Sequence, residues 1–277
     1  MEVRAAVLQH FINLFTEPWC NRPRLTGSFA SVGDREAVEL LEAEFSENEI
    51  VAAVKSCEGN KAPGPDGFNL MIFKKCWKVI KVDMLQFMQE FYQNAKLVKG
   101  INSSFVALIA KNENPSGLND YRPISLIGSL YKILAKVLAN RIKTVMPKII
   151  SVAQSAFIGG TNILDGVLVA NEIGDGWKKK RKSGIVLKLD FERAYDSINW
   201  NFLFTMLSNF GFGGKWISWM RECVSTARVS ILVNGSPTSE FSPQRGLRQG
   251  DPLSPFIFNI VAEGLNIILE RAKQLRL

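Results

Sequence analysis

The stretch KLDFERAYDSINW, residues 188–200, gives the clearest indication of the fold, because an apolar run ends there in the carboxylate of Asp190. In residues 185–190 alternate side chains face opposite sides of a predicted strand, which places Asp190 at the strand end beside a turn. Such a carboxylate suits Mg²⁺, which binds a few carboxylates together with substrate phosphates. A surface carboxylate that caps the turn is the alternative. Asp196 stands at a position typical of a helix N-cap.

A second stretch, GLRQGDPLSP at residues 246–255, predicts a glycine-rich turn that opens a helix. Its two glycines allow a backbone to approach a ligand closely, and Arg245 and Arg248 are expected to supply positive charge. Ser254 as N-cap and Pro255 at the first helical position begin a long helix whose N-terminus favours anions. A nucleotide is therefore expected to lie against this turn.

Composition narrows the class of protein. The chain has 277 residues, 47% apolar and 22% charged, with a net charge of +8 that favours a polyanionic partner. Its single histidine and four scattered cysteines argue against a zinc site, a Ser-His or Cys-His hydrolase, and a disulfide framework. No apolar run approaches the roughly 18 residues of a membrane span, so we expect a soluble, intracellular protein.

Local patterns predict a helix-rich chain with short, scattered strands. Ser46 and Glu49 form a capping box, and Asn234-Gly235 marks a hairpin turn. The predicted elements are a helix near residues 5–15, a loop at 18–36, a helix from 46 to 59, a turn-rich loop at 61–67, helical residues 70–99 broken near 79–82, a strand at 105–110, a helix through 130–138, a helix at 162–174, strands at 185–190, 229–233 and 237–241, and a terminal helix from 254.

Two basic features of the sequence each have more than one interpretation. Lys132, Lys136, Asn140 and Lys143 follow one helical face, either as a solvated surface or as a stripe that faces nucleic acid. The basic run 178–182 is a solvated loop, a nuclear address or a phosphate contact.

Five motifs together carry a resemblance to a known family. In chain order they are residues 61–67, 107–111, 119–126, 188–200 and 246–255. They resemble the polymerase region of reverse transcriptases from non-LTR (LINE-type) retrotransposons, closest to plant elements, from about Glu44 onward. The resemblance implies an α+β, right-hand polymerase fold, helix-rich with short antiparallel strands. Its expected parts are an N-terminal extension at 1–45, fingers at about 46–180 and a partial palm at about 181–277.

The resemblance implies RNA-directed DNA synthesis by two-metal nucleotidyl transfer. The expected partners are an RNA template, a DNA primer and deoxynucleoside triphosphates, and the cofactor is Mg²⁺, with two ions in the family's complete site. Asp190 would hold both ions, and the Phe191 carbonyl would bind one. Tyr195 would stack under the sugar and reject a 2′-hydroxyl, whereas without the family it is read as an amphipathic core tyrosine. Either the nucleus or the cytoplasm is consistent with the family.

The resemblance also implies contacts to the incoming nucleotide. Lys111 and Arg122 would pair with its triphosphate, whereas without the family both are read as solvated loop charges. Gln249 would contact the nucleotide near the template, with Gly250 beside it.

One departure from the family bears on activity. The family supplies its remaining metal-binding carboxylates from an aromatic-Ala-Asp-Asp hairpin beyond the helix that begins at Ser254, and this sequence has no Asp-Asp dipeptide. We therefore expect a palm that is truncated and a chain that is inactive alone, since metal charge compensation contributes several kcal/mol. The alternative function is a catalytically dead retroelement remnant that at most binds RNA, and an unrelated basic helical scaffold is a third hypothesis.

Overall fold

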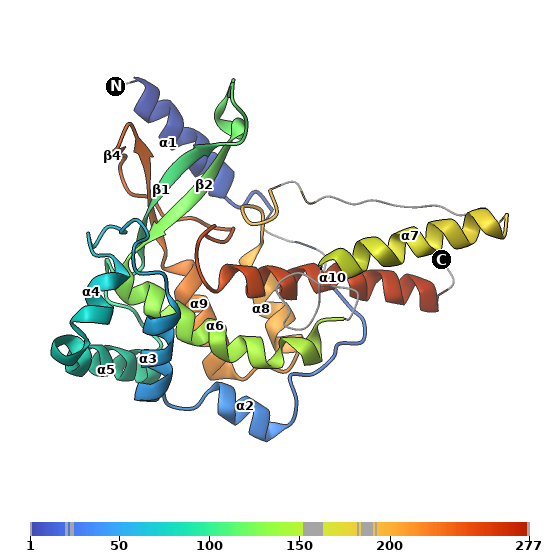
Figure 1. Ribbon diagram of the computed structural model, residues 1–277, viewed down its shortest axis with the longest axis horizontal. Helices are drawn as coiled ribbons and strands as arrows, with labels where there is room; N and C mark the ends of the chain where they lie inside the picture. Colours follow the sequence, from blue (N-terminus) through green and yellow to red (C-terminus); the bar gives the residue numbers. More distant parts are fainter. Residues whose placement is uncertain are drawn as a thin grey trace.

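A computed structural model describes residues 2–19, 22, 25–151, 163–181, 183, 191 and 193–275. The predicted strand at 185–190, with Asp190, lies outside these residues. The described chain is α+β and helix-rich, as expected, with one small sheet beside a helical body (Figure 1). Its helices are α1 Glu2–Phe15, α2 Arg35–Leu41, α3 Glu47–Ser56, α4 Leu70–Lys75, α5 Trp77–Asn94, α6 Ser129–Ile149, α7 Ile163–Lys179, α8 Trp200–Asn209, α9 Gly214–Ser225 and α10 Ser254–Gln274.

The sheet has the strand order β2-β1-β3-β4. β1 (Ser103–Ala110) pairs antiparallel with β2 (Tyr121–Ile127) and parallel with β3 (Arg228–Val233). β4 (Ser236–Pro237) completes a hairpin with β3 through Asn234 and Gly235, both at positive φ. The sheet is therefore mixed: the expected antiparallel pairing is found in β1–β2 and β3–β4, and the β1–β3 pair differs from it by being parallel. β2 was also missed, because its sequence contains Arg122 and Pro123 and has no clean alternation.

Helix α6 forms the centre of the main core. Its buried residues, among them Ile133, Leu134 and Leu138, pack in one continuous hydrophobic cluster that extends from Val32 to Ile267. A smaller cluster lies under α1, where Phe11 and its neighbours pack against the sheet. Figure 1 shows the β1–β2 pair projecting from the helical body next to α1.

The interaction of α6 with the 61–67 loop explains the sequence of that loop. A Cβ on Gly64 would lie 2.4 Å from the Gly128 nitrogen, so only glycine allows this approach. Asp66 accepts a hydrogen bond from the Ser129 amide, at the helix start where Gly128 has no capping side chain. The loop thus serves as the N-terminal cap of α6 from a distant part of the chain.

Other local predictions had mixed outcomes. The Ser46–Glu49 capping box is present, with the Glu49 carboxylate accepting from the Ser46 amide at 3.0 Å. The break in the helical region falls at Cys76, between α4 and α5, so its expected place near residues 79–82 is wrong. Lys132 and Lys136 are half-buried on α6, and Lys143 is exposed. Within the described residues, every helix is too short or too polar to span a bilayer.

We predict that Asp66→Ala lowers the free energy of unfolding by about 1 kcal/mol, the usual contribution of a helix cap. Urea unfolding followed by circular dichroism measures this change. Asp66→Asn keeps an oxygen acceptor and should retain most of the stability. An alanine variant as stable as the wild type would contradict the capping role.

Candidate nucleotide-binding site

The glycine-rich turn at 246–251 packs between two other segments of the chain. Gly246 and Gly250 have φ of +88° and +114°, values that favour glycine. A Cβ on Gly246 would lie 2.8 Å from the Asp196 carbonyl oxygen, and one on Gly250 would lie 2.9 Å from that of Ser125. The Ser125 amide donates to the Gln249 carbonyl over 2.7 Å. Gln249 is therefore placed directly beside strand β2.

A buried ion pair holds this turn in place. Arg248 Nη2 lies 2.9 Å from Asp251 Oδ2, and both side chains are more than nine-tenths buried. The Tyr131 hydroxyl donates to the same carboxylate over 2.9 Å, and burial raises the pKa of Tyr131 well above its usual value. The Arg248 guanidinium also lies 4.2 Å from the centre of the Tyr131 ring. Arg248 is thus a structural residue, and the expectation that it offers charge to a ligand is wrong.

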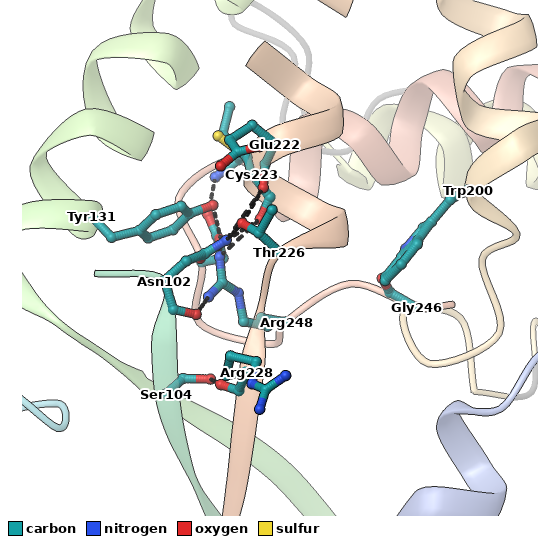
Figure 2. Close-up of polar contacts among 12 residues, drawn as sticks. Asn102, Ser104, Tyr131, Trp200, Glu222, Cys223, Thr226, Arg228, Gly246 and Arg248 are labelled. Atoms are coloured by element: carbon teal, nitrogen blue, oxygen red, sulfur yellow. Dashed lines mark hydrogen bonds and ion pairs between the residues drawn. The ribbon is translucent and has the colours of Figure 1, made fainter. Parts of the chain in front are cut away.

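A polar cluster around Asn102 extends this anchor to β1 and α9 (Figure 2). The Asn102 side-chain amide donates to the Cys223 carbonyl and to the Thr226 hydroxyl, over 3.0 and 2.9 Å. Arg248 donates to the Asn102 carbonyl over 3.3 Å, and Figure 2 shows its side chain lying between Asn102 and Tyr131. The residue before β1 and the C-terminal end of α9 are therefore both connected to the 246–251 turn.

Residues 195–200 form hydrogen bonds along the other side of the turn. The amides of Gly246 and Leu247 donate to the carbonyls of Ile198 and Tyr195, each over 2.8 Å. The Trp200 indole donates to the Gly246 carbonyl over 2.8 Å, a contact visible in Figure 2. The two stretches that indicated the fold from sequence are therefore in direct contact.

The Tyr195 ring is half-buried, stacked on Phe258 of α10 with ring centres 5.3 Å apart. Burial raises the pKa of its hydroxyl. The Phe191 ring packs edge-on against the Phe258 ring, with ring centres 6.0 Å apart, and Phe191 is 51% exposed. Phe258 therefore supports both aromatic side chains.

An open pocket of about 320 Å³ joins the turn to the end of the β1–β2 hairpin. Lys111, Arg122, Tyr195 and Gln249 all line it, so the structure brings together these predicted site residues. Gly250 and Phe191 lie close by in sequence and do not line the pocket. Asp190 is outside the described residues.

Helix α1 supplies a wall of the same pocket that sequence analysis missed. His10, Phe11 and Leu14 line it, more than 90 residues before Lys111. Arg245 holds this wall by donating to the Leu14 carbonyl over 3.0 and 2.9 Å. Arg245 therefore fixes α1, contrary to the expected role of ligand-facing charge. No sequence pattern links such distant segments.

Asp196 also lines this pocket, and its structural role differs from the expected one. The N-cap of α8 is Asn199, whose side chain accepts from the Phe202 amide over 2.8 Å, so the predicted capping role of Asp196 is wrong. Burial raises the pKa of Asp196 to about 6, although the positive charges of Arg193, Lys111 and Arg245 oppose the shift.

The start of α10 differs by one residue from the expected one. Ser254 is the first residue of α10, and Leu253, in place of Ser254, holds the N-cap position.

Comparison with known proteins identifies the family. The sequence model for "Reverse transcriptase (RNA-dependent DNA polymerase)" matches residues 109–275. The chain belongs to this family, and the predicted relation to non-LTR retrotransposon reverse transcriptases is confirmed by its relatives.

One relative is the "Transposon TX1 uncharacterized 149 kDa protein" of Xenopus laevis, 27% identical over 233 residues that cover 84% of this chain and 18% of the relative. Another is the "Retrovirus-related Pol polyprotein from type-2 retrotransposable element R2DM" of Drosophila melanogaster, 26% identical, covering 74% of this chain and 19% of the relative. The chain thus spans less than a fifth of either relative. A chain of a solved "Partial Cas6-RT-Cas1--Cas2 complex" has a TM-score of 0.45 at 15% identity, covering 84% of this chain and 35% of that one, and supports no conclusion.

We predict that Asp196→Asn stabilises the protein by about 1–2 kcal/mol at pH 8 and has little effect near pH 4. The folded-state pKa is raised from 3.8 to about 6, so ionisation opposes folding as the pH rises through this window. Near pH 4 the carboxyl is largely protonated in the folded state, and asparagine removes no penalty. Urea unfolding at the two pH values measures the difference.

The matched control is Asp83→Asn, which removes one negative charge from an exposed position on α5. A gain in Asp196→Asn that is equal at both pH values would contradict the burial of an ionisable group at this position.

Proposed function

We propose that this chain supplies the nucleotide-binding part of an RNA-directed DNA polymerase from a non-LTR retrotransposon. The observation that carries the proposal is the convergence of Lys111, Arg122, Tyr195 and Gln249 on one pocket. These residues come from the β1–β2 hairpin and from two palm motifs, and each has a chemical part to play with a deoxynucleoside triphosphate.

The two cations from the hairpin would bind the triphosphate. Lys111 and Arg122 are exposed at the pocket wall, so their charge is available to phosphate oxygens. Phosphoryl transfer depends on such charge stabilisation and positioning more than on covalent chemistry of the protein.

Tyr195 and Gln249 would position the nucleoside. Stacking on Phe258 fixes the Tyr195 ring, which supports a steric role beneath the sugar. The bond between the Gln249 carbonyl and the Ser125 amide fixes the Gln249 backbone, and Gly250 permits that close approach. The proposed roles therefore rest on side chains whose attachment points are held by neighbouring segments.

The family's Mg²⁺ ions would be held by Asp190 and the Phe191 carbonyl. Within the described residues no group of three or more His, Cys, Asp or Glu side chains forms a metal site. Asp196, a carboxylate of the pocket, is flanked by Lys111 and Arg193, so it does not fit a metal ligand. The assignment of the Mg²⁺ site therefore depends on Asp190.

We also propose the division into an N-terminal extension at 1–45, fingers at about 46–180 and a palm at about 181–277. The expected RNA template and DNA primer would be attracted by the net charge of +8.

The proposal predicts template-dependent nucleotide binding. With a 3′-dideoxy-terminated DNA primer on an RNA template, the complementary deoxynucleotide should bind at least about tenfold more tightly than a mismatched one, since base pairing adds to the pocket contacts. Binding is measured by fluorescence anisotropy of the labelled primer–template during a heparin challenge. Lys111→Gln should weaken this binding about tenfold, and Lys99→Gln, outside the pocket, should not.

RNA binding with no dependence on nucleotide identity would contradict the proposal and favour the RNA-binding remnant. For primer extension with Mg²⁺ or Mn²⁺, we predict no product from this chain alone, because its sequence has no Asp-Asp dipeptide. Extension that disappears in Asp190→Ala would contradict the predicted inactivity.

A further inference from the structure

Arg193 is a cation of the nucleotide pocket to which sequence analysis gave no role. It is exposed in the turn that follows Phe191 and lines the pocket together with Lys111 and Arg122. Its Nη2 donates to the side-chain oxygen of Asn119 over 2.8 Å. This contact joins the turn of the predicted palm to the loop of the β1–β2 hairpin, 74 residues apart in sequence.

Asn119 provides acceptors for two pocket cations. Besides the bond from Arg193, its backbone carbonyl accepts from Lys111 Nζ over 2.7 Å. The neighbouring Asp120 holds the loop, because its carboxylate accepts from the amides of Ser116 and Gly117 over 2.8 and 3.2 Å. Both cations therefore donate to an oxygen of the same residue, Asn119, at the pocket rim.

The charge of Arg193 acts on other groups in the pocket. It lowers the pKa of Asp196 against the effect of burial, and it adds to burial in lowering the pKa of His10 on α1. The charge of Arg193 therefore reaches both His10 on the α1 wall and Asp196, and Lys111 of the hairpin wall acts on the same Asp196 carboxyl.

We propose that Arg193 is a third triphosphate-binding cation, and that the Asn119 side chain positions it until phosphate oxygens replace the amide acceptor. This inference rests on the proposed function of the same pocket. The exchange is favourable because a hydrogen bond from guanidinium to an anionic oxygen is stronger than one to a neutral amide. A guanidinium also offers two parallel donors to phosphate, so lysine would replace it only in part.

A phosphate of an RNA backbone has the same chemistry as a nucleotide phosphate. The position of Arg193 in one pocket with Tyr195 and Gln249, the residues proposed to contact the nucleoside, favours the triphosphate. The test must therefore separate the two sources of phosphate.

The test compares dissociation constants of dTTP and dTMP, measured by equilibrium dialysis of the full chain without primer–template. The dissociation constant of dTMP divided by that of dTTP isolates the contribution of the outer phosphates, and this quotient is the ratio compared among the variants. Arg193→Gln should reduce this ratio about tenfold, and Arg193→Lys should reduce it less. Asn119→Asp should also reduce it, because a carboxylate next to Arg193 competes with phosphate.

The matched control is Arg35→Gln, the same substitution at an exposed residue on α2. The Arg35 side chain is ion-paired with Glu39, one turn further along the same helix, and lies outside the pocket. This control substitution should leave the ratio unchanged. Circular dichroism and thermal melting of every variant establish that the fold is retained.

The outcomes separate this assignment from the proposed function. A ratio that falls in Lys111→Gln and is unchanged in Arg193→Gln would overturn the role of Arg193 and leave the nucleotide pocket standing. A wild-type protein without preference for dTTP would overturn both. An unchanged ratio in Arg193→Gln together with weaker binding of a single-stranded RNA would assign Arg193 to the RNA backbone and overturn the inference.

Discussion

The buried ion pair between Arg248 and Asp251 is the constraint on which the candidate site depends. Two charges taken out of water destabilise a fold unless their remaining hydrogen-bonding positions are satisfied. Here the Tyr131 hydroxyl, the Leu253 amide and the Asn102 carbonyl satisfy them. The pair therefore fixes the turn at 246–251 against α6, α9 and the start of β1 together, and the pocket residues Tyr195 and Gln249 take their backbone positions from that turn.

Local features could be predicted from sequence because their partners lie within a few residues. The Ser46–Glu49 capping box and the Asn234-Gly235 turn are of this kind. Features with distant partners could not be predicted. β2 is held by pairing with β1, and the guanidinium of Arg248 is buried against the ring of Tyr131, far away in sequence, although the carboxylate that neutralises it, Asp251, is only three residues away. An arginine beside two glycines has the same sequence signature whether it faces a ligand or the core.

The candidate site shows the same division between local and distant information. The resemblance to a family named Lys111, Arg122, Tyr195 and Gln249, and the fold places them around one pocket. It did not indicate that α1 lines this pocket or that Asn119 contacts Arg193, since both arise from packing between segments far apart. The position of Asp196 before a helix predicts a cap, and its burial is not visible in the sequence because the 246–251 turn packed against it is far away along the chain.

Hydrogen exchange of backbone amides, followed by mass spectrometry, tests the anchoring role of the Arg248–Asp251 pair most directly. In Asp251→Asn the account predicts faster exchange in β2 and in residues 246–251, because the bond from the Ser125 amide to Gln249 would open more often. Exchange in α3, which is outside the anchor, should stay at the wild-type rate. Unchanged exchange in β2 and in the turn would contradict the account.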